Sequence, residues 1–151
     1  MDAAAGSACG LPAHRDRRQI VLVGYGLTAL AALPGHDPVV ISLGTNDPRG
    51  SAAAFAQDVE RALDVAGRGR CLVWATIWRD GGPDEELNAV LRAAAAAHAE
   101  LRLLEWDAML ADHPEWLAPD GLHGSPEGYA ARAVEAARLV RECPPAPREP
   151  A

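Results

Sequence analysis

The chain has 151 residues with 14 basic and 21 acidic side chains, which gives a formal charge of -7. This length suffices for one domain whose core needs neither a disulfide nor a structural metal. The acidic balance argues against nucleic acid or an anionic membrane as partner, because phosphate contacts require clustered cations. No stretch approaches the roughly 20 apolar residues of a membrane span, and the first residues do not resemble a signal peptide. Taken as it stands, the sequence predicts a cytoplasmic protein.

The three cysteines, Cys9, Cys71 and Cys143, are widely separated and form no C-x-x-C pair. This pattern predicts neither a disulfide framework nor a zinc site, and Cys71, which opens an apolar run, is expected to be a small core residue. We expect no metal and no other cofactor. The best candidates for metal ligands are Asp112, His113, Asp120 and His123, but their spacing matches no established metal site.

In chain order, residues 1–19 are small, polar and interrupted by glycine and proline, which predicts an irregular segment. Residues 20–33 leave two interpretations open. The opening run from Ile20 to Val23 is typical of a buried strand, whereas a helix is indicated by the apolar face of Leu22, Leu27, Leu30 and Leu33.

The pattern is clearer from residue 38 onward. Apolar runs predict strands at 38–43, 71–77 and 101–106. Helical spacing predicts helices at 51–66, 85–99 and 126–141, with Ser51 and Ser125 as N-caps and Pro126 in the first turn. We expect a long loop at 107–125 and a disordered proline-rich tail at 143–151.

Strands that alternate with helices predict right-handed crossovers and a parallel sheet covered on both faces. The fold class is therefore a three-layer α/β/α domain, which we assign to residues 20–142. In such sheets the ligand site lies outside the carboxyl ends of the strands, so the loops after Leu43, Ile77 and Trp106 are the places to search.

Two polar clusters occupy this predicted edge. Hydrolysis of an ester needs a base, a carboxylate that fixes the tautomer of the base, and donors aimed at the developing oxyanion. An Asp three residues before a His in a turn can present both side chains to one point, so Asp120 and His123 are candidates for orienter and base. Asn46 offers side-chain N–H groups, and Gly44 offers a backbone N–H that no Cβ shields.

The sequence Gly-Thr-Asn-Asp at 44–47, followed by Asp-Gly-Leu-His at 120–123, resembles the third and fifth blocks of the SGNH (GDSL-type) hydrolases. Residues 103–133 are also similar to bacterial SGNH domains, including those attached to O-acyltransferases. The resemblance implies a flavodoxin-like fold and a serine hydrolase acting on a small-molecule or carbohydrate acyl ester. It further implies Asn46 as an oxyanion donor, His123 as the general base and Asp120 as its orienting carboxylate.

The chain departs from this family in having no Gly-Asp-Ser block, which carries the family's nucleophile. Two alignments of the front are open. In one, residues 20–28 form the first block, with Tyr25 and Gly26 in place of Asp and Ser. In the other, residues 2–6 end the second strand, Gly6 is the glycine of the second block and a further substrate-binding residue, and residues 18–33 are mostly helix. The spacing favours the second alignment.

The second alignment leads us to expect the first strand and its serine upstream of Met1, where a leader could also direct the protein out of the cytoplasm. Ser7 is a poor substitute nucleophile, because no strand precedes it. The alternative function is a non-catalytic SGNH-like remnant or binding module that keeps the pocket without the nucleophile. The sequence carries no signal for the oligomeric state.

Overall fold

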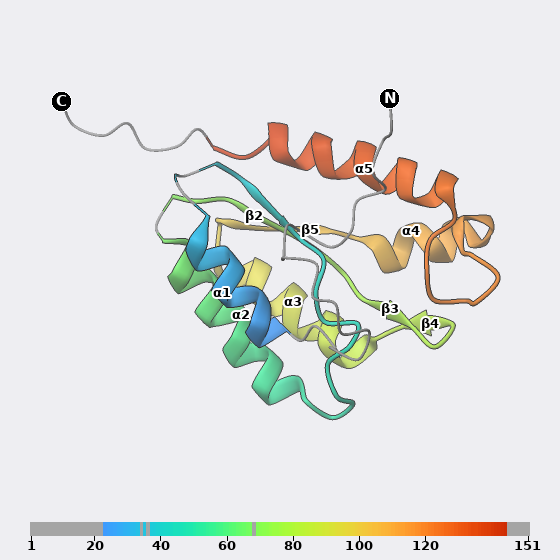
Figure 1. Ribbon diagram of the computed structural model, residues 1–151, viewed down its shortest axis with the longest axis horizontal. Coiled ribbons are helices and arrows are strands. Elements are labelled where there is room, and N and C mark those ends of the chain that lie inside the picture. The colour runs from blue at the N-terminus through green and yellow to red at the C-terminus, as the bar shows by residue number, and fades with distance from the viewer. Residues whose placement is uncertain (1–22, 34, 36, 68, 145–151) are drawn as a thin grey trace.

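The computed structural model describes residues 23–144 except 34, 36 and 68. These residues form three layers, in which a parallel sheet lies between helices α1, α2 and α3 on one face and α4 and α5 on the other (Figure 1). The helices are α1 (Val23–Ala32), α2 (Ala52–Ala66), α3 (Glu85–Ala97), α4 (Trp106–Asp112), the 3₁₀ turn η1 (Pro114–Trp116) and α5 (Pro126–Arg141). The strands are β1 (Val39–Ile41), β2 (Leu72–Ala75), β3 (Trp78–Arg79), β4 (Gly82–Pro83) and β5 (Leu101–Leu104).

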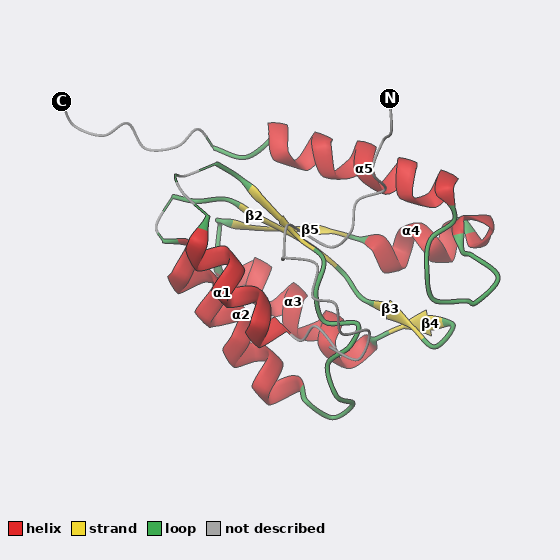
Figure 2. Cartoon of the chain, viewed as in Figure 1, coloured by secondary structure: helices red, strands yellow, loops and turns green. Residues whose placement is uncertain are grey.

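The sheet has the strand order β1-β2-β5, and both pairings are parallel. Helix α2 connects β1 to β2 and helix α3 connects β2 to β5, as a parallel sheet requires. The predicted α/β class with a parallel sheet is confirmed. Strands β3 and β4 form a separate antiparallel hairpin beyond the carboxyl end of β2 (Figure 2).

The central strand β2 supplies both faces of the core because successive side chains point to opposite sides. Leu72 and Trp74 belong to the cluster under α1, α2 and α3. Val73 and Ala75 belong to the cluster under α4 and α5. All four residues are buried, which explains why β2 reads in the sequence as a continuous apolar run.

The structure decides between the two interpretations of residues 20–33 wherever it describes them. Residues 23–32 are helical, so Tyr25 and Gly26 lie inside α1 and do not form a strand followed by a turn. Leu30 is buried in the core, and a Cβ on Gly26 would lie 2.2 Å from the Cδ1 atom of Leu43. The interpretation as a first block is therefore wrong. Residues 1–22, including Gly6 and Ser7, lie outside the described part of the chain.

The predicted loop at 107–125 is wrong in its first half, which contains α4 and η1. Trp106, predicted to end a strand, is the first residue of α4, and both Trp106 and Leu110 are buried under α5. A helix of seven residues is too short for apolar periodicity to reveal. Ser51 is the N-cap residue of α2, as predicted, but its hydroxyl donates to the Pro48 carbonyl and makes no capping hydrogen bond to the helix.

The expectation that the cysteines form no disulfide is wrong for one pair. Cys71 and Cys143 are bonded, with their Cα atoms 5.8 Å apart and a sequence separation of 72. Cys71 directly precedes β2, and α5 runs back across the sheet so that Cys143, just beyond its end, lies beside Cys71. This approach depends on the tertiary fold, about which cysteine spacing carries no information.

Candidate active site

The turn at 120–123, between η1 and α5, is closed by the side chain of Asp120. Its Oδ1 atom accepts hydrogen bonds from the N–H groups of Leu122 and His123, both at 2.9 Å. Gly121 has a φ of 69°, which a glycine adopts without strain. Its N–H donates to the carbonyl of Ala118 at 3.0 Å. The residue types at 120 and 121 therefore define this turn locally.

Within this turn, the Nδ1 atom of His123 lies 2.7 Å from the Oδ2 atom of Asp120. The two side chains are 64% and 52% exposed, so the pair is open to solvent and substrate. The pKa of Asp120 is lowered to about 2, mainly by the hydrogen bond with the His123 side chain and to a smaller extent by those from the two backbone N–H groups. The carboxylate is thus ionised at neutral pH and can hold a proton on Nδ1. Nε2 makes no hydrogen bond to any residue that the structure describes, so it is available as a base.

The 120–123 turn is anchored to the helices on that face. The Ala118 N–H donates to the His123 carbonyl at 2.8 Å. Ser125 caps α5 as predicted, because its hydroxyl accepts a hydrogen bond from the Gly128 N–H at 3.1 Å. Gly124 packs against the rings of Trp106 and Tyr129, which stack with their centroids 6.4 Å apart. His123 therefore sits on a supported loop.

The turn at 44–47 follows β1 and is built around Gly44. This residue has a φ of 120°, and a Cβ there would lie 2.4 Å from the Cδ1 atom of Ile77. The backbone conformation and the contact with Ile77 thus both require glycine at position 44. The sequence alone suggests a different reason for this glycine, which is the access that it gives to its backbone N–H. The Gly44 N–H has no acceptor among the described residues, which leaves it available to an oxyanion. The Asp47 N–H donates to the Gly44 carbonyl at 3.0 Å.

Asn46 is exposed, and its amide makes no hydrogen bond within residues 23–33, 35, 37–67 and 69–144. The structure pairs Asp120 with His123 but shows no contact between Asn46 and His123. The two turns are neighbours through β3: Arg79 donates to carbonyls of the 44–47 turn, and Trp78 donates to the Gly121 carbonyl. Both turns therefore contact the same short strand, and a shared site for Asn46 and His123 stays a prediction.

Comparison with protein families decides the assignment. A model of the family described as GDSL-like lipase/acylhydrolase matches residues 9–131. The chain belongs to this family. No curated protein is significantly similar to it. As a member of the GDSL-like family, the chain has an ester-hydrolase type of function at the family level.

This GDSL-like domain also has a buried polar cluster that the sequence did not reveal. Asn88 is fully buried on α3, where its side chain accepts from the Ile77 N–H at 2.7 Å and donates to the Ile77 carbonyl at 2.9 Å. Its Nδ2 atom also donates to the Oδ2 atom of Asp107 at 3.0 Å. One amide thus satisfies the backbone at the point where β2 ends, which helps to fix the start of β3.

Asp107 is the second buried member of this cluster and lies in the first turn of α4. It accepts hydrogen bonds from the Thr76 hydroxyl and from Arg92, both at 2.7 Å. Burial alone would raise the pKa of Asp107, but the hydrogen bonds from Thr76, Arg92 and the Ala108 N–H outweigh burial and lower it. The cluster joins the segment that follows β2 to α3 and α4. Tertiary contacts of this kind leave no local sequence signal.

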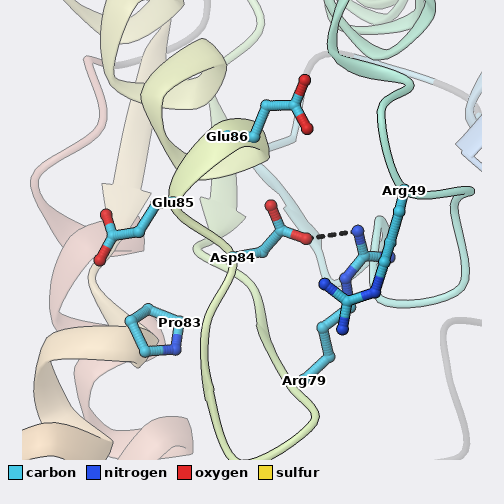
Figure 3. A pocket seen from close by; sticks show the side chains of 6 residues that line it. All are labelled: Arg49, Arg79, Pro83, Asp84, Glu85 and Glu86. Carbon is cyan, nitrogen blue, oxygen red and sulfur yellow. Dashed lines mark ion pairs between the residues drawn. The ribbon is translucent and has the colours of Figure 1, made fainter.

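A pocket of about 260 Å³ opens beside the β3–β4 hairpin (Figure 3). Within it, Arg79 forms an ion pair with Asp84, the N-cap of α3, and both side chains are more than nine-tenths buried. Neither Asn46 nor His123 lines this pocket. The lining residues are Arg49, Arg79, Pro83, Asp84, Glu85 and Glu86.

Proposed function

We propose that the chain is a serine-type ester hydrolase domain in which His123 is the general base, Asp120 orients it, and Asn46 and the Gly44 N–H stabilise the oxyanion. This proposal rests on the hydrogen-bonded Asp120–His123 pair, in which no described residue engages the Nε2 atom of His123. An ionised carboxylate that accepts a hydrogen bond from the Nδ1–H group fixes the tautomer of His123 in which Nε2 can accept a proton. Membership of the GDSL-like family supports the ester as the bond attacked.

In the proposed reaction, a serine hydroxyl attacks the ester carbonyl carbon while its proton passes to Nε2 of His123. The oxyanion that forms is bound by Asn46 and by the Gly44 N–H. Collapse expels the alcohol, which takes the proton from His123, and leaves an acyl-enzyme. Water deprotonated by His123 then releases the acid and restores the serine.

The nucleophile is proposed to come from outside the described residues. The chain has four serines, at 7, 42, 51 and 125. Ser42 accepts a hydrogen bond from Arg132, Ser51 donates to Pro48, and Ser125 caps α5. The hydroxyls of these three serines are therefore engaged elsewhere, and none is hydrogen-bonded to His123.

We propose a small-molecule or carbohydrate acyl ester as the substrate class. The exposure of Asp120 and His123, each above one half, supports a site that accepts an ester on a bulky polar alcohol without enclosing it. A long acyl chain would need an enclosed apolar tunnel. Among the described residues, no such tunnel surrounds the Asp120–His123 pair.

The test is hydrolysis of p-nitrophenyl acetate by the purified protein, expressed both as given and with the upstream reading frame in which the serine is expected. His123→Ala is expected to lower kcat at least about 100-fold, because the general base is lost. His113→Ala is the matched control, since His113 is also an exposed histidine paired with an acid, Glu115, at 2.9 Å. Its turnover is expected to equal that of the parent. Equal rates for the two variants would contradict the proposal.

A non-catalytic binding module is the second candidate function, and the engaged hydroxyls of the three described serines favour it. A fluorophosphonate probe, which labels activated serines, separates the two. Labelling that His123→Ala abolishes supports the hydrolase, and the labelled peptide identifies the nucleophile. A chain that is neither labelled nor active on p-nitrophenyl acetate would overturn the hydrolase proposal for this polypeptide and favour the binding module.

The Cys71–Cys143 disulfide bears on location. Disulfides persist in oxidising compartments and are rare in the reducing cytosol. We therefore propose that the protein functions outside the cytosol, in place of the cytoplasmic location expected from the sequence. None of the helices within the described residues is long and apolar enough to cross a membrane.

A further inference from the structure

Strand β3 contacts both turns of the candidate site through two adjacent side chains. Neighbouring residues of a strand point to opposite sides, so Trp78 and Arg79 extend in different directions. The Nε1 atom of Trp78 donates to the Gly121 carbonyl at 3.1 Å, within the 120–123 turn. The NH1 group of Arg79 donates to the carbonyls of Thr45 at 3.2 Å and Asp47 at 2.5 Å, within the 44–47 turn.

Arg79 is held firmly enough to act as a fixed point. Its side chain is only 9% exposed, and its NH2 group pairs with Asp84, which also caps α3 by accepting from the Leu87 N–H at 3.0 Å. The Nε atom of Arg79 is buried and has no hydrogen-bond partner among the residues that the structure describes. A buried donor without an acceptor is destabilising. The guanidinium is thus oriented toward the 44–47 turn and Asp84 even though one of its own groups stays unsatisfied.

The hairpin also contacts the 120–123 turn by its backbone. A Cβ on Gly121 would lie 4.0 Å from the Cα atom of Gly81, between β3 and β4. Ile77, directly before β3, is fixed at its N–H and carbonyl by Asn88. The strand is therefore tied to the body of the domain at one end and to both turns along its length.

We propose that Trp78 and Arg79 are positioning residues of the site: Arg79 fixes the oxyanion turn at 44–47, and Trp78 fixes the base turn at 120–123. The catalytic meaning of these turns rests on the proposed function. Oxyanion donors and a general base act together only when their separation is held to within a fraction of an ångström. One short strand that contacts both turns sets that separation directly.

The proposal is tested without a substrate, so a failure of the hydrolase proposal would leave this test intact. The first readout is the pKa of the Asp120 carboxyl, measured by carbon NMR, which is about 2 while the turn is closed. Trp78→Phe removes the indole N–H and is expected to raise this pKa toward the ordinary value of 3.8. The matched control is Trp74→Phe, which removes an equivalent 3.1 Å bond from the indole to the Leu43 carbonyl. It is expected to leave the pKa of Asp120 unchanged.

The second readout is hydrogen exchange at the Asp47 N–H, which reports the 44–47 turn. Arg79→Met removes two donors to this turn and is expected to speed exchange about tenfold. Arg49→Met is the control, because Arg49 lines the same pocket but, within the described part of the chain, forms an ion pair only with the exposed Asp80. The N–H of Leu72, at the start of the central strand β2, donates to the Glu100 carbonyl and reports global opening.

The two readouts together decide the proposal. It stands if Trp78→Phe shifts the pKa of Asp120 and Arg79→Met speeds exchange at Asp47 beyond any change at Leu72. It is overturned if either variant behaves as its control does. It is also overturned if Asp47 and Leu72 accelerate by the same factor, because Arg79 would then stabilise the domain as a whole and not the turn.

Discussion

Asn88 and Asp107 are hydrogen-bonded in the protein interior, with the Nδ2 atom of Asn88 3.0 Å from the Oδ2 atom of Asp107. Through this contact α3 and α4 are joined at the end of β2, where Asn88 also satisfies the backbone of Ile77. The cluster lies directly before β3, which contacts both candidate catalytic turns. The two candidate catalytic turns are thus supported by this buried polar network as well as by the apolar core.

Replacing Asn88 by leucine is expected to lower the free energy of unfolding by roughly 3 kcal/mol. The change leaves the Ile77 N–H buried without its partner and removes one of the two hydrogen bonds to the Ile77 carbonyl, which keeps that from the Asp84 N–H. Asn46→Leu is the matched control, since Asn46 is exposed and is expected to change stability by no more than about 0.5 kcal/mol. Urea denaturation measures both. A loss of stability in the Asn88 variant no greater than in the control would show that the network is dispensable.

Asp107 makes stability dependent on pH. Its folded pKa lies below the ordinary value of 3.8, so the unfolded chain binds this proton more readily. The stabilisation is therefore complete above about pH 5 and is lost as the pH falls through the folded pKa. Asp107→Asn is expected to flatten this acid limb in urea titrations between pH 2 and pH 6. Asp112→Asn, at the exposed end of the same helix, should retain it.

Gly44→Ala is expected to destabilise the domain by roughly 3 kcal/mol, because strain at a φ of 120° adds to the clash with Ile77. Gly50→Ala is the control: its φ is 70°, but a Cβ there meets nothing within 4 Å. Backbone strain alone should cost it about 1 kcal/mol. Thermal denaturation of the two variants separates packing from backbone conformation. Equal losses would argue against the contact with Ile77.

Cys143→Ser is expected to lower stability by about 2–4 kcal/mol, because the bond closes a loop with a sequence separation of 72. Under non-reducing conditions in denaturant, a thiol reagent should detect one thiol among the three cysteines of the parent and two in the variant. Detection of three thiols in the parent would show that the bond does not form.

Asp120→Asn is expected to reduce kcat on p-nitrophenyl acetate by about 10²-fold or more, because an amide no longer fixes the proton on Nδ1 of His123. Glu115→Gln makes the same change in the exposed His113 pair and should leave kcat at the parent value. Steady-state kinetics of the two variants provide the comparison. Unchanged kcat in the Asp120 variant would remove this carboxylate from the mechanism.

Features determined by nearby residues could be predicted from the sequence. The start of α5 follows from a capping serine and a proline at 125 and 126, and the Asp120–His123 pair lies within one turn. The strands follow from apolar runs long enough to be buried. The predicted parallel sheet placed Gly44 and Asn46 at its carboxyl edge, after the strand expected to end at Leu43, and in the structure their turn contacts β3.

Features that depend on distant contacts could not be predicted. The Cys71–Cys143 bond and the hydrogen bonds from Arg79 to the 44–47 turn join segments more than 30 residues apart. Strand β3 has only two residues and α4 only seven, so neither shows a period. The role assigned to Gly6 stays a prediction, because this residue lies outside the described part of the chain.

The disulfide places the two turns of the candidate site in different parts of the covalent structure, one inside a closed ring and one outside it. The bond closes a ring that runs from Cys71 to Cys143 and contains β3 and the Asp120–His123 pair, whereas Gly44 and Asn46 lie outside it. A single backbone cut between β4 and α5 would leave the ring in one piece. A single cut between Asn46 and Cys71 would release the oxyanion turn from the base turn, and non-covalent contacts would then hold the two together, including the β1–β2 pairing and the hydrogen bonds that Trp74 and Arg79 donate.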